Sequence, residues 1–169
     1  MKQIVCTTLV LLALVAALVC GQSSESVSDV LKRVAEFHGN AGVFAVAGYR
    51  IGQRALQELG EKRGSFDLDV THRTPLQVQY SCVADGLQAA TGVSAGKLNL
   101  HVVEANLTQF ETIVKDRKTG KQLVFRLRPA FLKRYLDTPY DRQDAAASEV
   151  ATMPENEIFS VQSAPAARN

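Results

Sequence analysis

Two amphipathic helical patterns meet at a glycine-containing break, and no other part of the sequence limits the possible folds so strongly. The apolar stripe of the first pattern, over residues 26–36 and on to the break, is formed by Val27, Val30, Leu31, Val34 and Phe37. A second stripe runs over residues 43–59 and ends before Gly60. Gly39 and Gly42 allow backbone angles that are closed to other residues, so one helix can end and another begin within a few positions. His38 lies at this break, where its ring can point into a cleft.

The patterns after residue 60 change from helical to mostly extended. We expect a charged loop over 61–65, followed by strands at 66–70 and 76–80 (the second opened by Pro75), a short helix at 81–92, strands at 98–104, 107–115 and 123–127, helices at 129–137 and 144–151, and a last strand at 158–161. Helices first and antiparallel strands after predict an α+β fold, with N-terminal helices packed on a mainly antiparallel sheet. No linker splits the chain, so we predict a single domain over residues 22–161 and a disordered tail over 162–169.

The first 21 residues have the layout of a secretory signal. A short positive start, Met1-Lys2-Gln3, precedes an apolar stretch to Val19, and polar sequence begins at Gln22. We expect cleavage after Gly21, an exported protein (periplasmic or secreted), and membrane contact only through the cleaved signal. A membrane anchor is the alternative, but the apolar stretch is shorter than the roughly 20 residues that a spanning helix needs. A lipoprotein with Cys20 acylated is a further alternative that bulky Val19 disfavours.

Charge and cysteine content narrow the possible partners. The formal net charge is +2 and falls to +1 without Lys2, which gives no reason to expect nucleic acid as a partner. Cys6 and Cys20 leave with the signal, so Cys82 stands alone and cannot form an intramolecular disulfide. A single thiol in an exported protein is either buried and inert or bound to something.

Several short motifs recur in the order of one known family. They are His38-Gly39, Ala47-Gly48-Tyr49-Arg50, Cys82-Val83-Ala84-Asp85, Thr91-Gly92, Gly96-Lys97 with Asn99, Thr119-Gly120-Lys121 and the closing stretch Met153 to Phe159. Together, over about residues 28–161, they resemble the family named after the E subunit of formylmethanofuran dehydrogenase. The resemblance implies a small α+β domain that binds a divalent metal, commonly zinc, through histidine and cysteine, and that is often a dimer. An exported member would meet neither the cytoplasmic complex nor its cofactor, so we do not expect the named dehydrogenase activity.

The sequence departs from that family's pattern at the opening motif. The family motif reads Phe-His-Gly-His, one further residue, then Cys-Pro-Gly; here Asn40 replaces the second histidine and Gly42 replaces the cysteine. Val93 stands where a second cysteine often follows Thr-Gly, and the zinc-ribbon tail of some members is absent from this sequence. Half of the usual donor set is therefore lost.

The candidate site is centred on His38 and Cys82 as metal ligands, with zinc or another divalent ion as the cofactor. Asp85 is a possible oxygen ligand, and Asp85, Lys97 and Asn99 are candidates for binding a polar ligand. The alternatives are a degenerate site, with His38 and Cys82 as ordinary packed residues, and turn chemistry for Lys97 and Asn99.

The other two histidines are weaker candidates. We expect His72 to be solvated in a polar connector. We expect His101 to point away from whichever face its strand neighbours bury.

The function that these residues favour is binding of a metal ion or small polar ligand in a cleft near His38 and Cys82, with a homodimer as a possible assembly. Two alternatives stay open. One is an exported hydrolytic or redox enzyme in which a metal-bound water or the Cys82 thiolate reacts, although no catalytic residue is assigned. The other is an interaction protein that has kept the fold and lost the site. A further expectation concerns Gly48, which either permits close packing against a neighbour or is simply tolerated within its helix.

Overall fold

Two helices with a four-residue break between them open the part of the chain that the computed structural model describes, residues 25–164. Helix α2 spans Val27–His38; the Ser26 hydroxyl accepts from the Asp29 amide at its start, and Gly39 ends it with a φ of 88°. Helix α3 spans Val43–Leu59 and ends at Gly60, which has a φ of 69°. The predicted limits of both helices are confirmed, because glycine adopts the left-handed conformation that ends a helix without steric cost.

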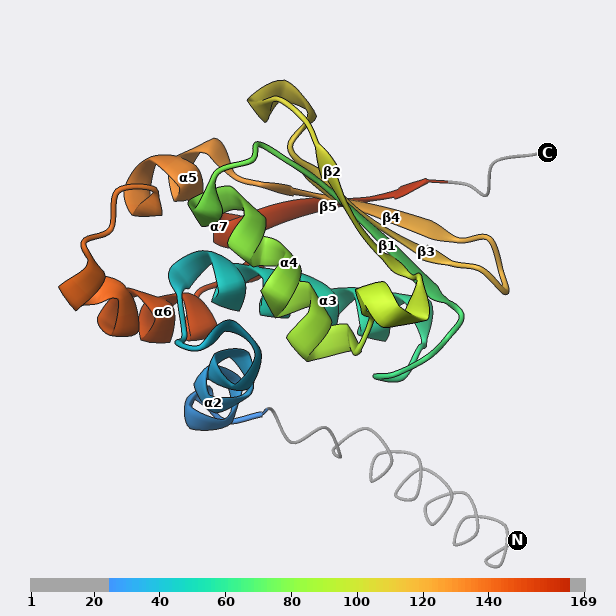
Figure 1. The fold of residues 1–169 in the computed structure, drawn as a ribbon, viewed down its shortest axis with the longest axis horizontal. Coiled ribbons are helices and arrows are strands. Elements are labelled where there is room, and N and C mark those ends of the chain that lie inside the picture. Colours follow the sequence, from blue (N-terminus) through green and yellow to red (C-terminus); the bar gives the residue numbers. More distant parts are fainter. Residues whose placement is uncertain (1–24, 165–169) are drawn as a thin grey trace, which may run out of the picture.

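A five-stranded sheet in the order β2-β1-β3-β4-β5 forms the second layer, and only the pairing of β1 with β2 is parallel. The strands are β1 (Leu68–Thr74), β2 (Leu100–Glu104), β3 (Glu111–Asp116), β4 (Gln122–Leu127) and β5 (Phe159–Ala164). Helix α4 (Val78–Thr91) is the crossover between β1 and β2. Figure 1 shows the helices gathered on one side of this sheet, which confirms the predicted α+β fold with a mainly antiparallel sheet in a single domain.

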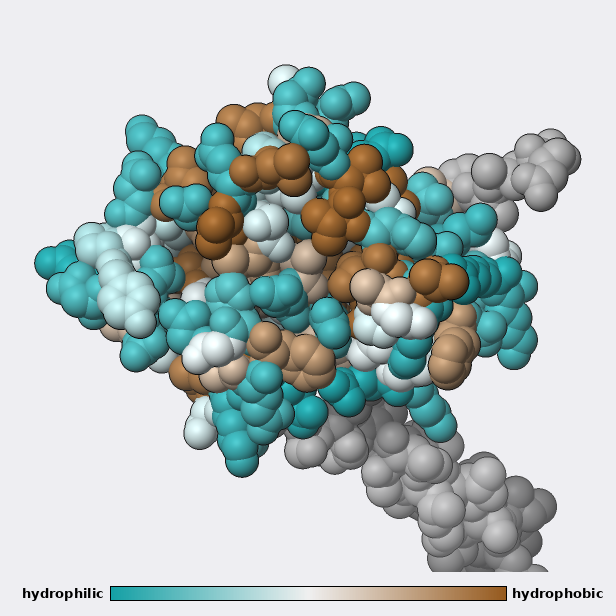
Figure 2. Space-filling model, in the orientation of Figure 1, coloured by the Kyte–Doolittle hydropathy of each residue, from teal (hydrophilic) through white to brown (hydrophobic). Residues whose placement is uncertain are grey.

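The remaining helices lie between β4 and β5. They are α5 (Pro129–Tyr135), α6 (Gln143–Thr152) and α7 (Glu155–Ile158), with short 3-10 turns η1 (Ala95–Lys97), η2 (Leu107–Gln109) and η3 (Tyr140–Arg142) elsewhere. No helix among residues 25–164 has the length and apolar character needed to cross a membrane. Outer strand β2 exposes Val102 and Val103, and Figure 2 shows apolar residues interspersed with polar ones over this face of the molecule.

Two sequence predictions about strands are wrong. The predicted strand over 76–80 is instead the start of α4: β1 runs to Thr74, Pro75 ends it, and the helix begins at Val78. The last strand extends three residues beyond its predicted end, because Gln162 to Ala164 pair with β4 as far as Gln122. The predicted tail is therefore partly sheet, and its residues 165–169, like the predicted signal over 1–21, lie outside the described residues.

Helices α3 and α4 touch backbone to backbone through glycines. A Cβ atom on Gly48 of α3 would stand 2.1 Å from the Val83 carbonyl oxygen of α4. A Cβ atom on Gly86 of α4 would stand 1.8 Å from the Ala45 carbonyl oxygen of α3. Real Cβ atoms do not approach backbone so closely, so Gly48 is needed for packing, as one of the two sequence interpretations held. This contact fixes where α4 sits along α3.

Candidate functional site

A cavity of about 290 Å³ lies where the break between α2 and α3 meets the first turns of α4. We call it the His38 cavity. Its lining residues are His38, Asn40, Gly42, Val43, Phe44, Val78, Gln79, Cys82, Tyr135, Leu136, Tyr140 and Gln143. The structure thus brings the two predicted metal ligands, His38 and Cys82, to one cavity, from elements 44 positions apart in the sequence.

His38 is held by Asp85, whose Oδ2 lies 2.8 Å from the imidazole Nδ1. An ionised carboxylate can only accept, so Nδ1 carries the hydrogen of this bond and Nε2 is left as the free basic nitrogen. Nε2 faces Gly42: a Cβ atom on Gly42 would stand 3.3 Å from Nε2 and 4.0 Å from the Asn40 Oδ1. An imidazole oriented by a carboxylate in this way is the usual form of a metal-bound histidine, and also of a general base.

Local structure explains how these side chains come together. His38 is the last residue of α2, and the left-handed turn at Gly39 ends the helix directly behind it. Cys82 and Asp85 lie three positions apart on α4, so they occupy neighbouring places on one helix face. The backbone contact at Gly48 and Gly86 sets the height of that face relative to the break.

Cys82 is a half-buried free thiol. Burial, and secondarily the negative charge of Asp85, raise the pKa of the Cys82 thiol to about 11. The protein alone therefore keeps Cys82 protonated at neutral pH. A metal ion would have to displace this proton in order to bind the sulfur, which makes its affinity depend on pH.

The donors present fit an open metal site and do not fit a closed one. A structural zinc site takes four protein ligands, whereas residues 25–164 contain no group of three or more His, Cys, Asp and Glu side chains arranged around one point. Asp85 hydrogen-bonds to His38 and does not line the cavity, so it acts on the imidazole and not as a ligand. The Gln143 amide is used elsewhere, since it accepts from the Val43 amide at 3.3 Å and donates to the Thr138 carbonyl at 2.9 Å.

Lys97 and Asn99 lie away from the His38 cavity. The Lys97 ammonium donates to the carbonyls of Gly92 at 2.9 Å and Gly64 at 3.2 Å, beyond the opposite end of α4. Cys82 and Gly92 are ten residues apart along that helix, which corresponds to about 15 Å at 1.5 Å per residue. Asn99 is fully buried, donates to the Leu68 carbonyl at 3.0 Å and accepts from the Ser94 amide at 3.0 Å. These contacts hold the loop before β2 in place.

The expectation that His72 is solvated is wrong. His72 is 1% exposed in the middle of β1, with Nδ1 2.9 Å from the Thr112 hydroxyl and Nε2 3.2 Å from the Tyr80 carbonyl. Burial lowers its pKa to about 4, so the ring stays neutral. His101 lies exposed on β2 with Nε2 3.1 Å from Asp69, and neither histidine lines the His38 cavity.

Sequence reasoning missed the far wall of the cavity. Tyr135, Leu136 and Tyr140 come from α5 and η3, about 100 positions after His38. No local pattern could have assigned them, because an aromatic residue on a short helix looks the same whether it faces a core or a cavity.

Comparisons with known proteins agree with this architecture. The family profile described as "FmdE, Molybdenum formylmethanofuran dehydrogenase operon" matches residues 37–166. Among solved structures, the chain is similar to an FmdE-like protein of tungsten formylmethanofuran dehydrogenase from Syntrophus aciditrophicus. The two have 17% sequence identity and a TM-score of 0.55, and the match covers 83% of this chain and 73% of that one. At this identity the structural match shows the shared fold alone. No curated protein matches the chain.

Proposed function

Because this chain belongs to the FmdE family, we propose that it is a binding domain that holds one divalent metal ion, such as zinc, in the His38 cavity. His38 Nε2 and the Cys82 sulfur would be its protein ligands, and the remaining positions would be left for water or a small polar ligand. We do not assign the dehydrogenase activity in the family's name to this chain.

The observation that carries the proposal is the 2.8 Å contact between His38 Nδ1 and Asp85. It fixes the tautomer and the orientation of the ring, and it aims Nε2 at the cavity that Cys82 also lines. Such a carboxylate commonly supports a metal-bound histidine and contributes about 10- to 100-fold to metal affinity. The structure thus revises the predicted part of Asp85 from oxygen ligand to supporting residue.

The raised pKa of Cys82 favours binding over thiol catalysis. A nucleophilic cysteine needs a lowered pKa so that a useful fraction is thiolate near neutral pH. Here burial and the Asp85 carboxylate push the pKa to about 11, in the opposite direction. A protonated thiol beside a neutral imidazole is a poor nucleophile but becomes a ligand once a metal ion displaces its proton.

The test is the metal content of the purified protein after incubation with zinc and dialysis, measured by elemental mass spectrometry. Parent, His38→Ala, Cys82→Ala and Asp85→Asn are compared, with His101→Ala as the matched control on an exposed histidine outside the cavity. We expect about one zinc per chain in the parent and the control, almost none in His38→Ala and Cys82→Ala, and roughly 10- to 100-fold weaker affinity in Asp85→Asn. A zinc-free parent, or variants that all retain zinc, would refute the site.

We also propose that the protein is exported and begins at Gln22 after removal of residues 1–21. This proposal rests on the sequence pattern alone. N-terminal sequencing of the protein recovered from its native source tests it, with Gln22 as the expected first residue. Recovery of chains that still carry residues 1–21 would contradict cleavage.

A further inference from the structure

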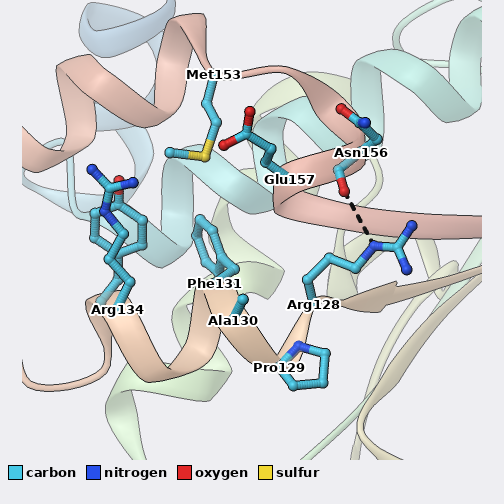
Figure 3. A pocket seen from close by; sticks show the side chains of 9 residues that line it. Arg128, Pro129, Ala130, Phe131, Arg134, Met153, Asn156 and Glu157 are labelled. Atoms are coloured by element: carbon cyan, nitrogen blue, oxygen red, sulfur yellow. Dashed lines mark hydrogen bonds between the residues drawn. The ribbon is translucent and has the colours of Figure 1, made fainter.

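A second cavity, of about 340 Å³, lies between α5 and the segment that leads into α7 (Figure 3). We call it the Met153 cavity. It is lined by Arg128, Pro129, Ala130, Phe131, Arg134, Tyr135, Met153, Asn156 and Glu157. Tyr135 lines this cavity and the His38 cavity, and so forms a shared wall. The closing stretch Met153 to Phe159, one of the motifs in the sequence, supplies one side of the new cavity and none of the His38 cavity.

We propose that the Met153 cavity binds a small apolar carboxylate, such as an aromatic or short aliphatic acid. Its volume lies within the range of about 300–1,000 Å³ that is typical of small-molecule sites. The site is distinct from the proposed metal site, and the inference does not depend on a metal being bound.

The inner walls suit an apolar ligand and are themselves well supported. Phe131 and Met153 are buried, and Figure 3 shows their side chains opposite each other across the cavity. The Phe131 ring packs edge-to-face on Phe44 at 5.8 Å and against Tyr135 at 4.9 Å between ring centres. A rigid aromatic wall facing a flexible methionine accommodates flat or short apolar groups of slightly different shape.

The Tyr135 hydroxyl supplies a polar group that needs a partner. Tyr135 is 4% exposed, and its hydroxyl oxygen is buried without a hydrogen-bond partner among the described residues. Burial, followed by the nearby Glu149 carboxylate, raises the pKa of Tyr135 to about 12, so the hydroxyl keeps its proton at neutral pH. A buried donor without a partner is unfavourable, and a ligand oxygen that accepts from it would relieve that cost.

Charge at the rim selects an acid over a neutral acceptor. The Arg128 Nε donates to the Asn156 carbonyl at 3.2 Å (Figure 3), and Arg128 forms no ion pair within residues 25–164. Its two terminal nitrogens can therefore receive a carboxylate. Arg134 lies over the Tyr135 ring, 5.1 Å from its centre, and is paired with Glu149. Glu157 is the single acidic residue of the lining and opposes an anion, so its removal should strengthen binding.

The experiment titrates the purified protein with benzoate and hexanoate, and with the uncharged benzamide and hexanamide, by calorimetry and by NMR. We expect each acid to bind at least tenfold more tightly than its amide. Tyr135→Phe and Arg128→Gln should each weaken binding of the acids about five- to tenfold. Glu157→Gln should strengthen it severalfold. Lys133→Gln, on the same helix but outside the lining, is the control and should change nothing.

All four substitutions are at exposed positions or remove a single hydroxyl, so the variants should fold, and thermal melts check this. The proposal is overturned if neither acid binds the parent, or if Arg128→Gln and Tyr135→Phe bind the acids as the parent does. It is also overturned if His38→Ala abolishes acid binding while Arg128→Gln leaves it intact, because the acid would then occupy the other cavity. Zinc content stays unchanged in Arg128→Gln, which separates this test from that of the metal site.

Discussion

One side of helix α4 packs against α3 with no room for a methyl group, whereas the side that carries Cys82 borders an open cavity. At the first contact, Gly86 and Gly48 bring backbone against backbone. At the second, Cys82 is half-buried and Asp85 reaches across to His38 at 2.8 Å. The site therefore owes its geometry to the tight contact: a single hydrogen bond cannot position a helix, but interlocked backbones can.

The two non-surface histidines show the same contrast. His38 has one ring nitrogen bonded to Asp85 and the other directed at the cavity. His72 has both ring nitrogens engaged, by the Thr112 hydroxyl and the Tyr80 carbonyl, inside the core. A histidine whose two nitrogens are used by the fold has nothing to offer a ligand, so His72 serves stability and His38 is available for binding.

The largest expected effect comes from breaking the tight contact with Gly86→Ala. The new methyl group would stand 1.8 Å from the Ala45 carbonyl oxygen, and backbone on both helices would have to separate. We expect a loss of more than about 3 kcal/mol in the free energy of unfolding, measured by urea denaturation. Gly96→Ala is the matched control, because the nearest atom to its methyl group is the Ser94 hydroxyl at 4.0 Å. Equal stability of the two variants would contradict the packing argument.

Acid should expose the buried histidine next. The folded-state pKa of His72 is about 4, below the ordinary value of 6.5 for the unfolded chain. Between these values the unfolded state binds a proton that the native state refuses, so stability falls as the pH is lowered. The loss attributable to His72 should reach about 3 kcal/mol at pH 4. NMR of the imidazole ring gives the decisive measurement: His72 should remain neutral at pH 5, and titration near pH 6.5 would show that it is not buried.

The state of the Cys82 thiol distinguishes the cavity from an activated site. With a pKa of about 11, the thiol is almost wholly protonated at pH 8. We expect iodoacetamide to alkylate Cys82 in the metal-free folded protein more than tenfold slower than in the same protein unfolded in urea. The rate is followed by mass spectrometry of the intact chain. Alkylation as fast in the folded state as in the unfolded one would mean that the cavity activates the sulfur.

The smallest effect on stability should come from Gly42→Ala, at the cavity itself. Gly42 has a φ of −67°, which alanine adopts readily, and the new methyl group would meet only the His38 ring at 3.3 Å. We expect a change in unfolding free energy within about 1 kcal/mol, but weaker zinc binding because the methyl group stands beside Nε2. Calorimetry and zinc titration check the two parts. Destabilisation as large as that of Gly86→Ala would show that the cavity edge is as tightly packed as the helix contact.

Much of the fold could be predicted from the sequence because its signals are local. Helical periodicity and terminal glycines indicate the bounds of α2 and α3, and alternating residues with a polar turn indicate the hairpin of β3 and β4. Residues 76–80 failed because an alternating apolar pattern also fits a first helical turn that exposes Leu76 and Val78 and buries Tyr80. Only contact with the rest of the molecule separates these two cases.

Residue types and their spacing were enough to establish the family, the layers of the fold, and the pairing of His38 with the Cys82–Asp85 helix as the place to look. The folded arrangement was needed to show that Asp85 supports His38, that Lys97 and Asn99 hold a loop, and that His72 is a core residue. It also showed that Tyr135 separates two cavities. This division arises because the local sequence fixes which groups a segment carries, whereas burial, charge state and hydrogen-bond partners depend on segments that are distant in the chain.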